Sequence, residues 1–316
     1  MPPLRPFLLL LLAVALLAAA APVLKWLQMN QPLGVGANEI NFCNVLFVGN
    51  AAAGLVALVT FRPSRIFSEL RVCPSLGWRR LAVSALFAVA IPVLLFLALE
   101  NTSVTNVVLL GRFESVVYAL LSAFVMKQAV PAMPRIGYAV IVVGILGLVL
   151  FQSDWALMRG ELFVLGAAVL QGVAAIVSKR TLEHISLGGF VFFRNLISAV
   201  LFFAVGAFHY GLEHFADAFG PELWLMMTVY AAVVTVGGQL AWYRSIDTLP
   251  ARDVANGSML SPVLGILFAY LLLHEVPSSV QWAGAAIVFA GMVLTRLGGS
   301  QPPKPSLGVE HSLTGS

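Results

Sequence analysis

The stretch VVLLGRFESVVYALLSAFVM, residues 107–126, is long and apolar enough to cross a membrane, yet it carries two charges near its middle. Ionisable residues at the centre of a membrane helix cost roughly 2.5–3.5 kcal/mol each on insertion scales, and they often mark substrate or proton pathways. Arg112 and Glu114 are separated by about 200° around a continuous helix, so each is expected to meet groups on other helices. The pair therefore predicts either a structural lock between helices or a site that handles substrate or protons.

Each charge has a specific chemical use. Glu114 is the candidate for proton coupling, and Tyr118, one turn later on the same face, could hydrogen-bond Glu114 or the substrate. A guanidinium makes forked, bidentate hydrogen bonds with carboxylates. Arg112, and Arg194 in the apolar stretch FFRNLISA, are therefore candidates for binding an anionic group. A structural ion pair remains the alternative for Arg194.

The composition indicates which elements must position these residues. The chain has 316 residues, of which 60% are hydrophobic and 10% are charged, and its mean hydropathy is +0.94. Soluble globular domains carry about 25% charged residues. Apolar runs of about 20 residues suit membrane-spanning helices, and the alternating pattern of a membrane barrel is absent. We predict an all-α membrane protein with ten transmembrane helices near residues 7–29, 41–60, 80–99, 103–126, 135–152, 161–179, 188–208, 222–245, 253–274 and 279–297.

The positions of the basic residues predict the orientation of these helices. With a cytoplasmic N-terminus, 14 of the 18 Lys and Arg residues lie on the cytoplasmic side, as the positive-inside rule requires. Both termini are then cytoplasmic in a multi-pass protein of the cell (inner) membrane. The orientation of the helices in the membrane accounts for the excess of Lys and Arg residues, so no nucleic-acid partner is expected. The first helix resembles a cleaved signal peptide, but the internal repeat described next requires that helix.

A weak internal repeat relates the two halves of the chain. A constant offset of 147 residues places helices 3–5 beside helices 8–10, and it aligns Glu100 with Asp247, Gly137 with Gly284 and Gly144 with Gly291. Helices 1–2 align with helices 6–7 after small loop adjustments. Since each half has an odd number of helices, the second half is inverted, as in transporters whose halves rock around a central site. The spaced glycines predict close helix–helix approach.

The repeat sets the domain organisation. Residues 1–152 form the first repeat, residues 153–297 form the second, and residues 298–316 form a tail rich in Gly, Pro and Ser that is predicted to be disordered. No metal ligand set, nucleophile motif or redox motif is present, so neither an enzyme, a metal nor a cofactor is expected. The two cysteines, Cys43 and Cys73, give no disulfide framework.

Helix-weakening residues at matching places in the two halves predict a hinge or a midplane site. Pro92 lies opposite Gln239 under the offset, next to Gly237 and Gly238. We therefore predict a hinge at Pro92, Gly237 and Gly238, with Gln239 and Trp242 lining the site. Ordinary tolerance of Pro and Gly in membrane helices and an interfacial position for Trp242 are the alternatives.

The second half carries a family pattern. It contains the aromatic and basic end of helix 8 in GGQLAWYRSIDTLPARDVANG, the SPV step in helix 9, LLLHE ending in Glu275, and the glycine-spaced last helix. Together with FFRNLISA, these motifs resemble the drug/metabolite transporter superfamily, in its ten-helix EamA-type branch, over residues 7–297. The first half departs from the pattern with GRFES in helix 4, Gln128 at the position of the terminal glutamate, and Asn44 at the position of the helix 2 arginine.

The resemblance implies a transporter of small metabolites that works without ATP. We predict a secondary active transporter, coupled to protons, that moves small polar metabolites such as amino acids or organic acids by alternating access. The expected partners are a small-molecule substrate and membrane lipids, with a monomer and a homodimer both open. The alternatives are a multidrug or amphiphile exporter, and a lipid flippase or non-transporting membrane scaffold.

Overall fold

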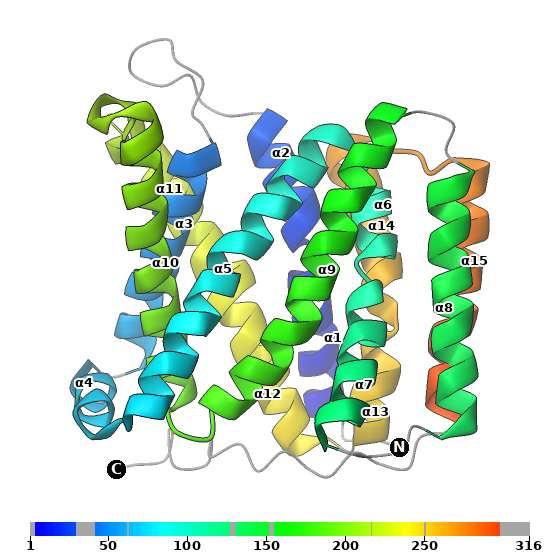
Figure 1. The fold of residues 1–316 in the computed structure, drawn as a ribbon, viewed down its shortest axis with the longest axis horizontal. Helices are drawn as coiled ribbons and strands as arrows, with labels where there is room; N and C mark the ends of the chain where they lie inside the picture. Colours follow the sequence, from blue (N-terminus) through cyan, green and yellow to red (C-terminus); the bar gives the residue numbers. More distant parts are fainter. Residues whose placement is uncertain are drawn as a thin grey trace. The chain divides into compact units, whose positions relative to one another are not determined.

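The computed structural model describes residues 4–29, 42–61, 63–126, 131–151, 155–215, 217–249 and 251–297. All regular structure within these residues is helical, and ten segments are long and apolar enough to cross a membrane (Figure 1). The predicted all-α membrane fold with ten spans is therefore confirmed. The predicted tail and Gln128 lie outside the described residues.

The elements follow one another without strands in the described residues. They are α1 (Leu4–Ala18), α2 (Ala20–Met29), α3 (Phe42–Thr60), α4 (Pro63–Val72), α5 (Ser75–Asn101), α6 (Val104–Leu110), α7 (Phe113–Met126), α8 (Ala132–Leu150), α9 (Trp155–Thr181), α10 (Leu187–Tyr210), the 3₁₀ turns η1 (Leu212–Phe215) and η2 (Asp217–Phe219), α11 (Pro221–Tyr230), the π-helical η3 (Ala231–Gly237), α12 (Gly238–Thr248), α13 (Ala251–Ser258), α14 (Leu260–Leu273) and α15 (Ser279–Leu297).

Two repeat-related spans are interrupted at matching positions. The fourth span breaks between α6 and α7, where Arg112 N donates to Leu109 O at 3.2 Å and Glu114 N donates to Gly111 O at 3.1 Å, each over three residues. The ninth span breaks between α13 and α14, where Met259 N donates to Asn256 O at 3.3 Å. Met259 follows Arg112 by the offset of 147 found in the sequence. The internal repeat therefore extends to the positions of the helix breaks.

Backbone contacts divide the chain into two compact units, and each unit combines segments from both sequence halves. The first unit contains the described parts of Met1–Trp26, Ile91–Ile176 and Leu240–Lys304, and the second contains those of Leu27–Ala90 and Val177–Gln239. The sequence repeat is therefore an internal relationship between helices, and its midpoint is not a boundary between the compact units.

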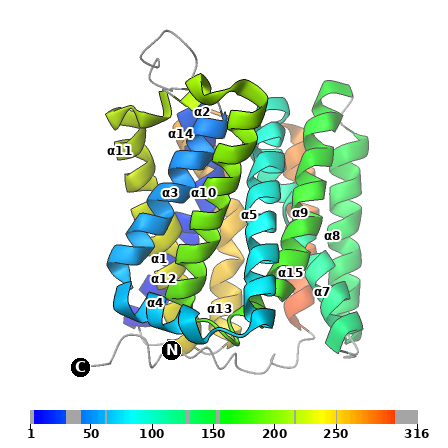
Figure 2. The same ribbon diagram turned by 60° about the vertical axis from the view of Figure 1, so that its left-hand side comes forward.

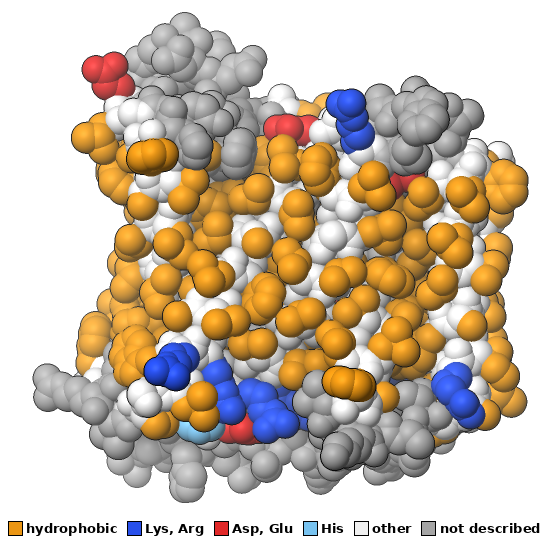
Figure 3. All heavy atoms as spheres, viewed as in Figure 1, with side chains coloured by type: hydrophobic (Ala, Val, Ile, Leu, Met, Phe, Trp, Pro, Cys, Tyr) orange, Lys and Arg blue, Asp and Glu red, His pale blue; other side chains and the backbone are white. Residues whose placement is uncertain are grey.

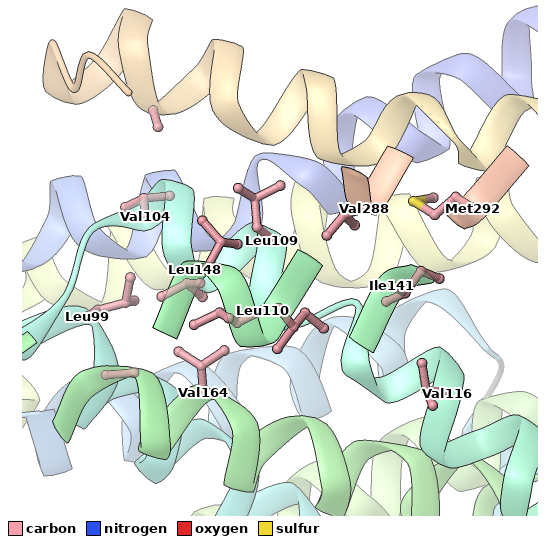
Figure 4. Close-up of a cluster of buried hydrophobic side chains, with 14 residues drawn as sticks. Leu99, Val104, Leu109, Leu110, Val116, Ile141, Leu148, Val164, Val288 and Met292 are labelled. Atoms are coloured by element: carbon pink, nitrogen blue, oxygen red, sulfur yellow. The ribbon is translucent and has the colours of Figure 1, made fainter. Parts of the chain in front are cut away.

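The first unit is built around an apolar cluster from six spans, including Ala269 of α14. Figure 4 shows the cluster, with Leu99 from α5, Val104, Leu109 and Leu110 from α6, Val116 from α7, Ile141 and Leu148 from α8, Val164 from α9, and Val288 and Met292 from α15. Helices α8 and α15 run side by side in both ribbon views (Figures 1 and 2). A Cβ at Gly137 would lie 2.5 Å from Thr295 N, and one at Gly291 would lie 2.8 Å from Gly137 O. These distances confirm the close helix approach predicted from the spaced glycines.

In the second unit, α3 and α10 pack side by side (Figure 2). At one end of this unit Arg80 Nη1 donates to Arg180 O at 3.0 Å and lies 3.9 Å from Glu183 Oε2. The start of the third span and the end of the sixth span, which the sequence places on the same side of the membrane, therefore meet. Figure 3 shows hydrophobic side chains along the helices, and Lys and Arg side chains near the lower ends of α5 and α9.

Candidate functional site

The break between α6 and α7 positions Arg112. Its Nη2 donates to Ser261 Oγ at 2.9 Å, and Ser261 lies in the first turn of α14, two residues beyond the break at Met259. Its Nε is buried and has no hydrogen-bond partner among the described residues. The guanidinium therefore joins the two helix breaks within the first unit and keeps one donor that a ligand could use.

Glu114 lies in the first turn of α7, partly buried, two residues from Arg112. The two side chains attract each other electrostatically, although the hydrogen bond of Arg112 goes to Ser261. The angular separation expected for a continuous helix does not apply, because Gly111 and Arg112 form a turn. Tyr118, also partly buried, lies where α9 approaches closely, since a Cβ at Gly172 would be 3.1 Å from Tyr118 N.

Arg194 belongs to the second unit, where α10 places it one turn after Phe190. Its Cζ lies 5.8 Å from the centroid of the Phe190 ring, within the range of a cation–π contact. The neighbouring Asn195 donates to Val191 O at 2.7 Å, one turn earlier in the same helix. The structure therefore assigns Arg112 and Glu114 to one unit and Arg194 to the other.

Trp242 and Gln239 lie in α12. Trp242 packs against an apolar cluster in the first unit, formed by Leu10, Val14, Leu249 and Val254. Gln239 is partly buried at the start of α12, in the second unit. Since the Trp242 ring packs among apolar side chains, its observed contacts are those of a packing residue.

The residues predicted as a hinge differ in backbone structure. Pro92 lies inside α5, which runs without interruption from Ser75 to Asn101. Gly237 ends the π-helical η3, and Gly238 begins α12. A Cβ at Gly237 would lie 2.9 Å from Ala232 O, and π-helical turns are frequent at functional sites. Motion at these residues stays a prediction.

The sequence reasoning missed a buried polar network in the first unit. Asn106 of α6 donates from Nδ2 to Thr102 Oγ1 at 2.9 Å and to Glu161 Oε1 at 3.2 Å. Gln281 of α15 donates from Nε2 to Asn106 Oδ1 at 2.9 Å and to Ser103 Oγ at 2.8 Å. Glu161 of α9 is 0% exposed, and its Oε2 has no hydrogen-bond partner among the described residues. The network thus joins three spans and the short link before α6 at one buried carboxyl group.

Local capping interactions hold this network in place. Ser278 and Gln281 form a reciprocal capping box, with Ser278 N donating to Gln281 Oε1 at 2.8 Å and Gln281 N donating to Ser278 Oγ at 3.2 Å. The spacing S-x-x-Q before an apolar helix is a sequence signature of this motif. Gln281 was therefore detectable from sequence, whereas Glu161 gave no signal beyond being an acid at the start of an apolar run.

Glu275 adds a charged cap to α6. Its Oε2 accepts from Val104 N at 2.9 Å and its Oε1 accepts from Thr105 N at 2.8 Å. His274 precedes it in the left-handed conformation, with φ at 53°, and ends α14. A carboxylate at a helix N-terminus satisfies free backbone donors and is favoured by the helix dipole. This cap joins the ends of the fourth and ninth spans.

The described residues contain no group of three or more His, Cys, Asp and Glu side chains that could hold a metal ion.

The EamA-like transporter family matches the chain twice, over residues 4–150 and 158–297. Each match contains five of the ten spans, as the predicted two-repeat architecture requires. A solved crystal structure of a protein aligns with 93% of this chain and 97% of its own, with a TM-score of 0.62 and 17% identity, which shows a shared fold.

Several relatives are named as transporters. The uncharacterized transporter sll1164 of Synechocystis sp. is 35% identical over 299 residues, which cover 90% of this chain and 85% of its own. A probable amino-acid metabolite efflux pump of Salmonella typhimurium is 25% identical over 186 residues, 56% of this chain and 62% of its own. The riboflavin transporter ImpX of Fusobacterium nucleatum is 25% identical over 143 residues, 45% of this chain and 48% of its own.

Proposed function

The chain belongs to the EamA-like transporter family, and from this premise we propose that it is a proton-coupled secondary transporter of small polar metabolites that carry an anionic group. Amino acids and organic acids are the substrate classes that fit. Transport proceeds by alternating access across the cytoplasmic (inner) membrane, with both termini on the cytoplasmic side.

The observation that carries the proposal is the position of Arg112. It lies in the break between α6 and α7 and bonds Ser261 just beyond the matching break before α14. Interrupted helices at corresponding places of inverted repeats are where transporters of this architecture bind substrate. A guanidinium with a buried, unused donor suits the forked geometry of a carboxylate.

Two further findings support the substrate class and the orientation. The name of one relative refers to an amino-acid metabolite, which falls within the proposed substrate class. The contact of Arg80 with the carbonyl of Arg180 brings together the basic ends of α5 and α9, as expected if both ends are cytoplasmic.

The test uses the purified full-length chain in proteoliposomes with an imposed pH gradient and a panel of radiolabelled amino acids and organic acids. Arg112→Lys keeps the charge but loses the fork, so we expect the KM for carboxylate substrates to rise at least about tenfold, equivalent to about 1.4 kcal/mol. The matched control is Arg135→Lys at an exposed position of α8, which should leave KM unchanged.

Three outcomes would contradict the proposal. An equal KM for wild type and Arg112→Lys would remove Arg112 from substrate binding. Flux of lipophilic cations in place of carboxylates would favour the amphiphile exporter. Absence of flux for every solute under any gradient would favour the lipid flippase or the membrane scaffold.

A further inference from the structure

The polar network around Glu161 lies inside an apolar part of the first unit. Val164, one turn after Glu161 on α9, belongs to the cluster that Figure 4 shows with Leu99 and Val104. Gly160 allows α9 to approach the end of α5, since a Cβ there would lie 2.8 Å from Thr102 Cβ. Glu161 is fully buried as a result.

The backbone N–H of Ser278 determines how the side-chain amides of Gln281 and Asn106 are oriented. Ser278 N donates to Gln281 Oε1, so the other end of that amide, Nε2, must face Asn106 Oδ1. The Asn106 amide is oriented in turn, with Nδ2 towards Thr102 and Glu161. Swapping either amide would place two donors or two acceptors opposite each other.

The available amide hydrogens are then all used. Each NH₂ group has two hydrogens, and Asn106 and Gln281 each make two donor contacts. Glu161 receives one of these hydrogens, at Oε1, and none reaches Oε2. The carboxyl group therefore has one oxygen satisfied by a neutral amide and one oxygen with no donor among the described residues.

The described charged side chains on the surrounding elements either interact with other groups or are exposed. Lys25 of α2 donates to Leu99 O and attracts Glu100 and Glu275. Glu275 bonds the backbone of α6, and Arg159 on α9 is exposed. An ionised carboxylate that is buried without a cation partner costs several kcal/mol. A small cation on Oε2 removes that cost.

We propose that Glu161 is the site that binds the coupling proton, and that the bound proton keeps Thr102, Asn106 and Gln281 joined in this conformation. The proton comes from water, forms an O–H bond at Oε2 and leaves a neutral carboxyl group. When it is released to the other side, the carboxylate regains its charge and the network opens. This inference rests on the proposed proton coupling and assigns it to Glu161 instead of Glu114.

The first test needs no variant. Dicyclohexylcarbodiimide reacts with protonated carboxyl groups in apolar surroundings, and peptide mass spectrometry locates the adduct. In the purified wild-type protein we expect labelling of Glu161 whose rate falls by up to about tenfold per pH unit between pH 6 and pH 9. Absence of Glu161 labelling at pH 6 would overturn the proton site. Slower labelling in 100 mM NaCl than in 100 mM KCl would also overturn it and would identify Na⁺ as the ligand.

The second test measures coupling with the substrate identified in the flux panel. In Glu161→Gln we expect uptake driven by the pH gradient to fall at least about tenfold, while substrate exchange without a gradient persists. Glu222→Gln, at an exposed position in α11, is the matched control. Gradient-driven uptake that persists in Glu161→Gln would overturn the assignment. If uptake by the wild-type protein does not depend on the pH gradient, the proton coupling of the proposed function is refuted, whatever the labelling result.

Discussion

Replacing Gln281 by Ala tests whether the amide network stabilises the folded protein. Gln281 makes two interhelical hydrogen bonds, to Ser103 Oγ at 2.8 Å and to Asn106 Oδ1 at 2.9 Å. Its Oε1 also accepts from Ser278 N within the capping box at 2.8 Å. The truncation removes all three contacts, including the hydrogen bond that Asn106, which is 1% exposed, accepts from Gln281.

The size of the effect follows from measured values for such contacts. Interhelical hydrogen bonds in membrane proteins average about 0.6 kcal/mol each, with a maximum near 1.7 kcal/mol. A capping interaction contributes about 1 kcal/mol. Two interhelical bonds and one cap therefore predict a loss of about 2 kcal/mol in the free energy of unfolding, which changes the ratio of folded to unfolded protein about 30-fold.

Equilibrium unfolding in mixed micelles of a mild detergent and sodium dodecyl sulfate, followed by circular dichroism, measures this loss. Ser279→Ala, exposed on the first turn of the same helix, is the control. A double-mutant cycle with Asn106→Ala isolates the pair, and we expect a coupling energy of about 0.6–1.7 kcal/mol. A coupling below about 0.3 kcal/mol would mean that the two amides do not act together, and the reasoning about the network would be refuted.

Three further predictions concern packing, capping and thiol chemistry. Gly291→Val should lower the free energy of unfolding by about 1–3 kcal/mol, because its side chain would meet the backbone of α8, whereas Gly147→Val should change it by less than about 0.5 kcal/mol, since nothing lies within 4 Å of a Cβ there. Glu275→Ala should lower it by about 1–2 kcal/mol through loss of the two bonds to the start of α6. Burial raises the pKa of the Cys73 thiol, so labelling by a membrane-impermeant maleimide should accelerate as pH rises from 7 to 9, because the thiolate is the reactive form; buried Cys43 should stay unlabelled.

The measurements that contradict these predictions are specific. Equal stability of Gly291→Val and Gly147→Val in the micelle titration would show that α8 and α15 are not in close backbone contact. An unchanged unfolding curve for Glu275→Ala would remove the cap on α6. Labelling of Cys73 at a rate independent of pH would contradict the effect of burial, and labelling from the extracytoplasmic side would invert the predicted topology.

Much of the candidate site was predictable because membrane insertion makes charge expensive. Arg112 and Glu114 stood out against their apolar neighbours, and the offset of 147 residues located the equivalent segment around Met259 and Ser261. Neither the offset nor the charges indicated that both spans would break there. A helix break depends on a few backbone hydrogen bonds that shift from four to three residues, and apolar periodicity does not report them.

The sequence by itself determined the ten spans, the two related halves and the close packing of the glycine-bearing helices, because each depends on local composition and spacing. Only the tertiary structure decided that Arg112 bonds Ser261 and that Asn106, Gln281 and Glu161 form one network. The physical reason is that a membrane-buried polar side chain must find its partner on another helix, and the identity of that partner depends on how the helices pack.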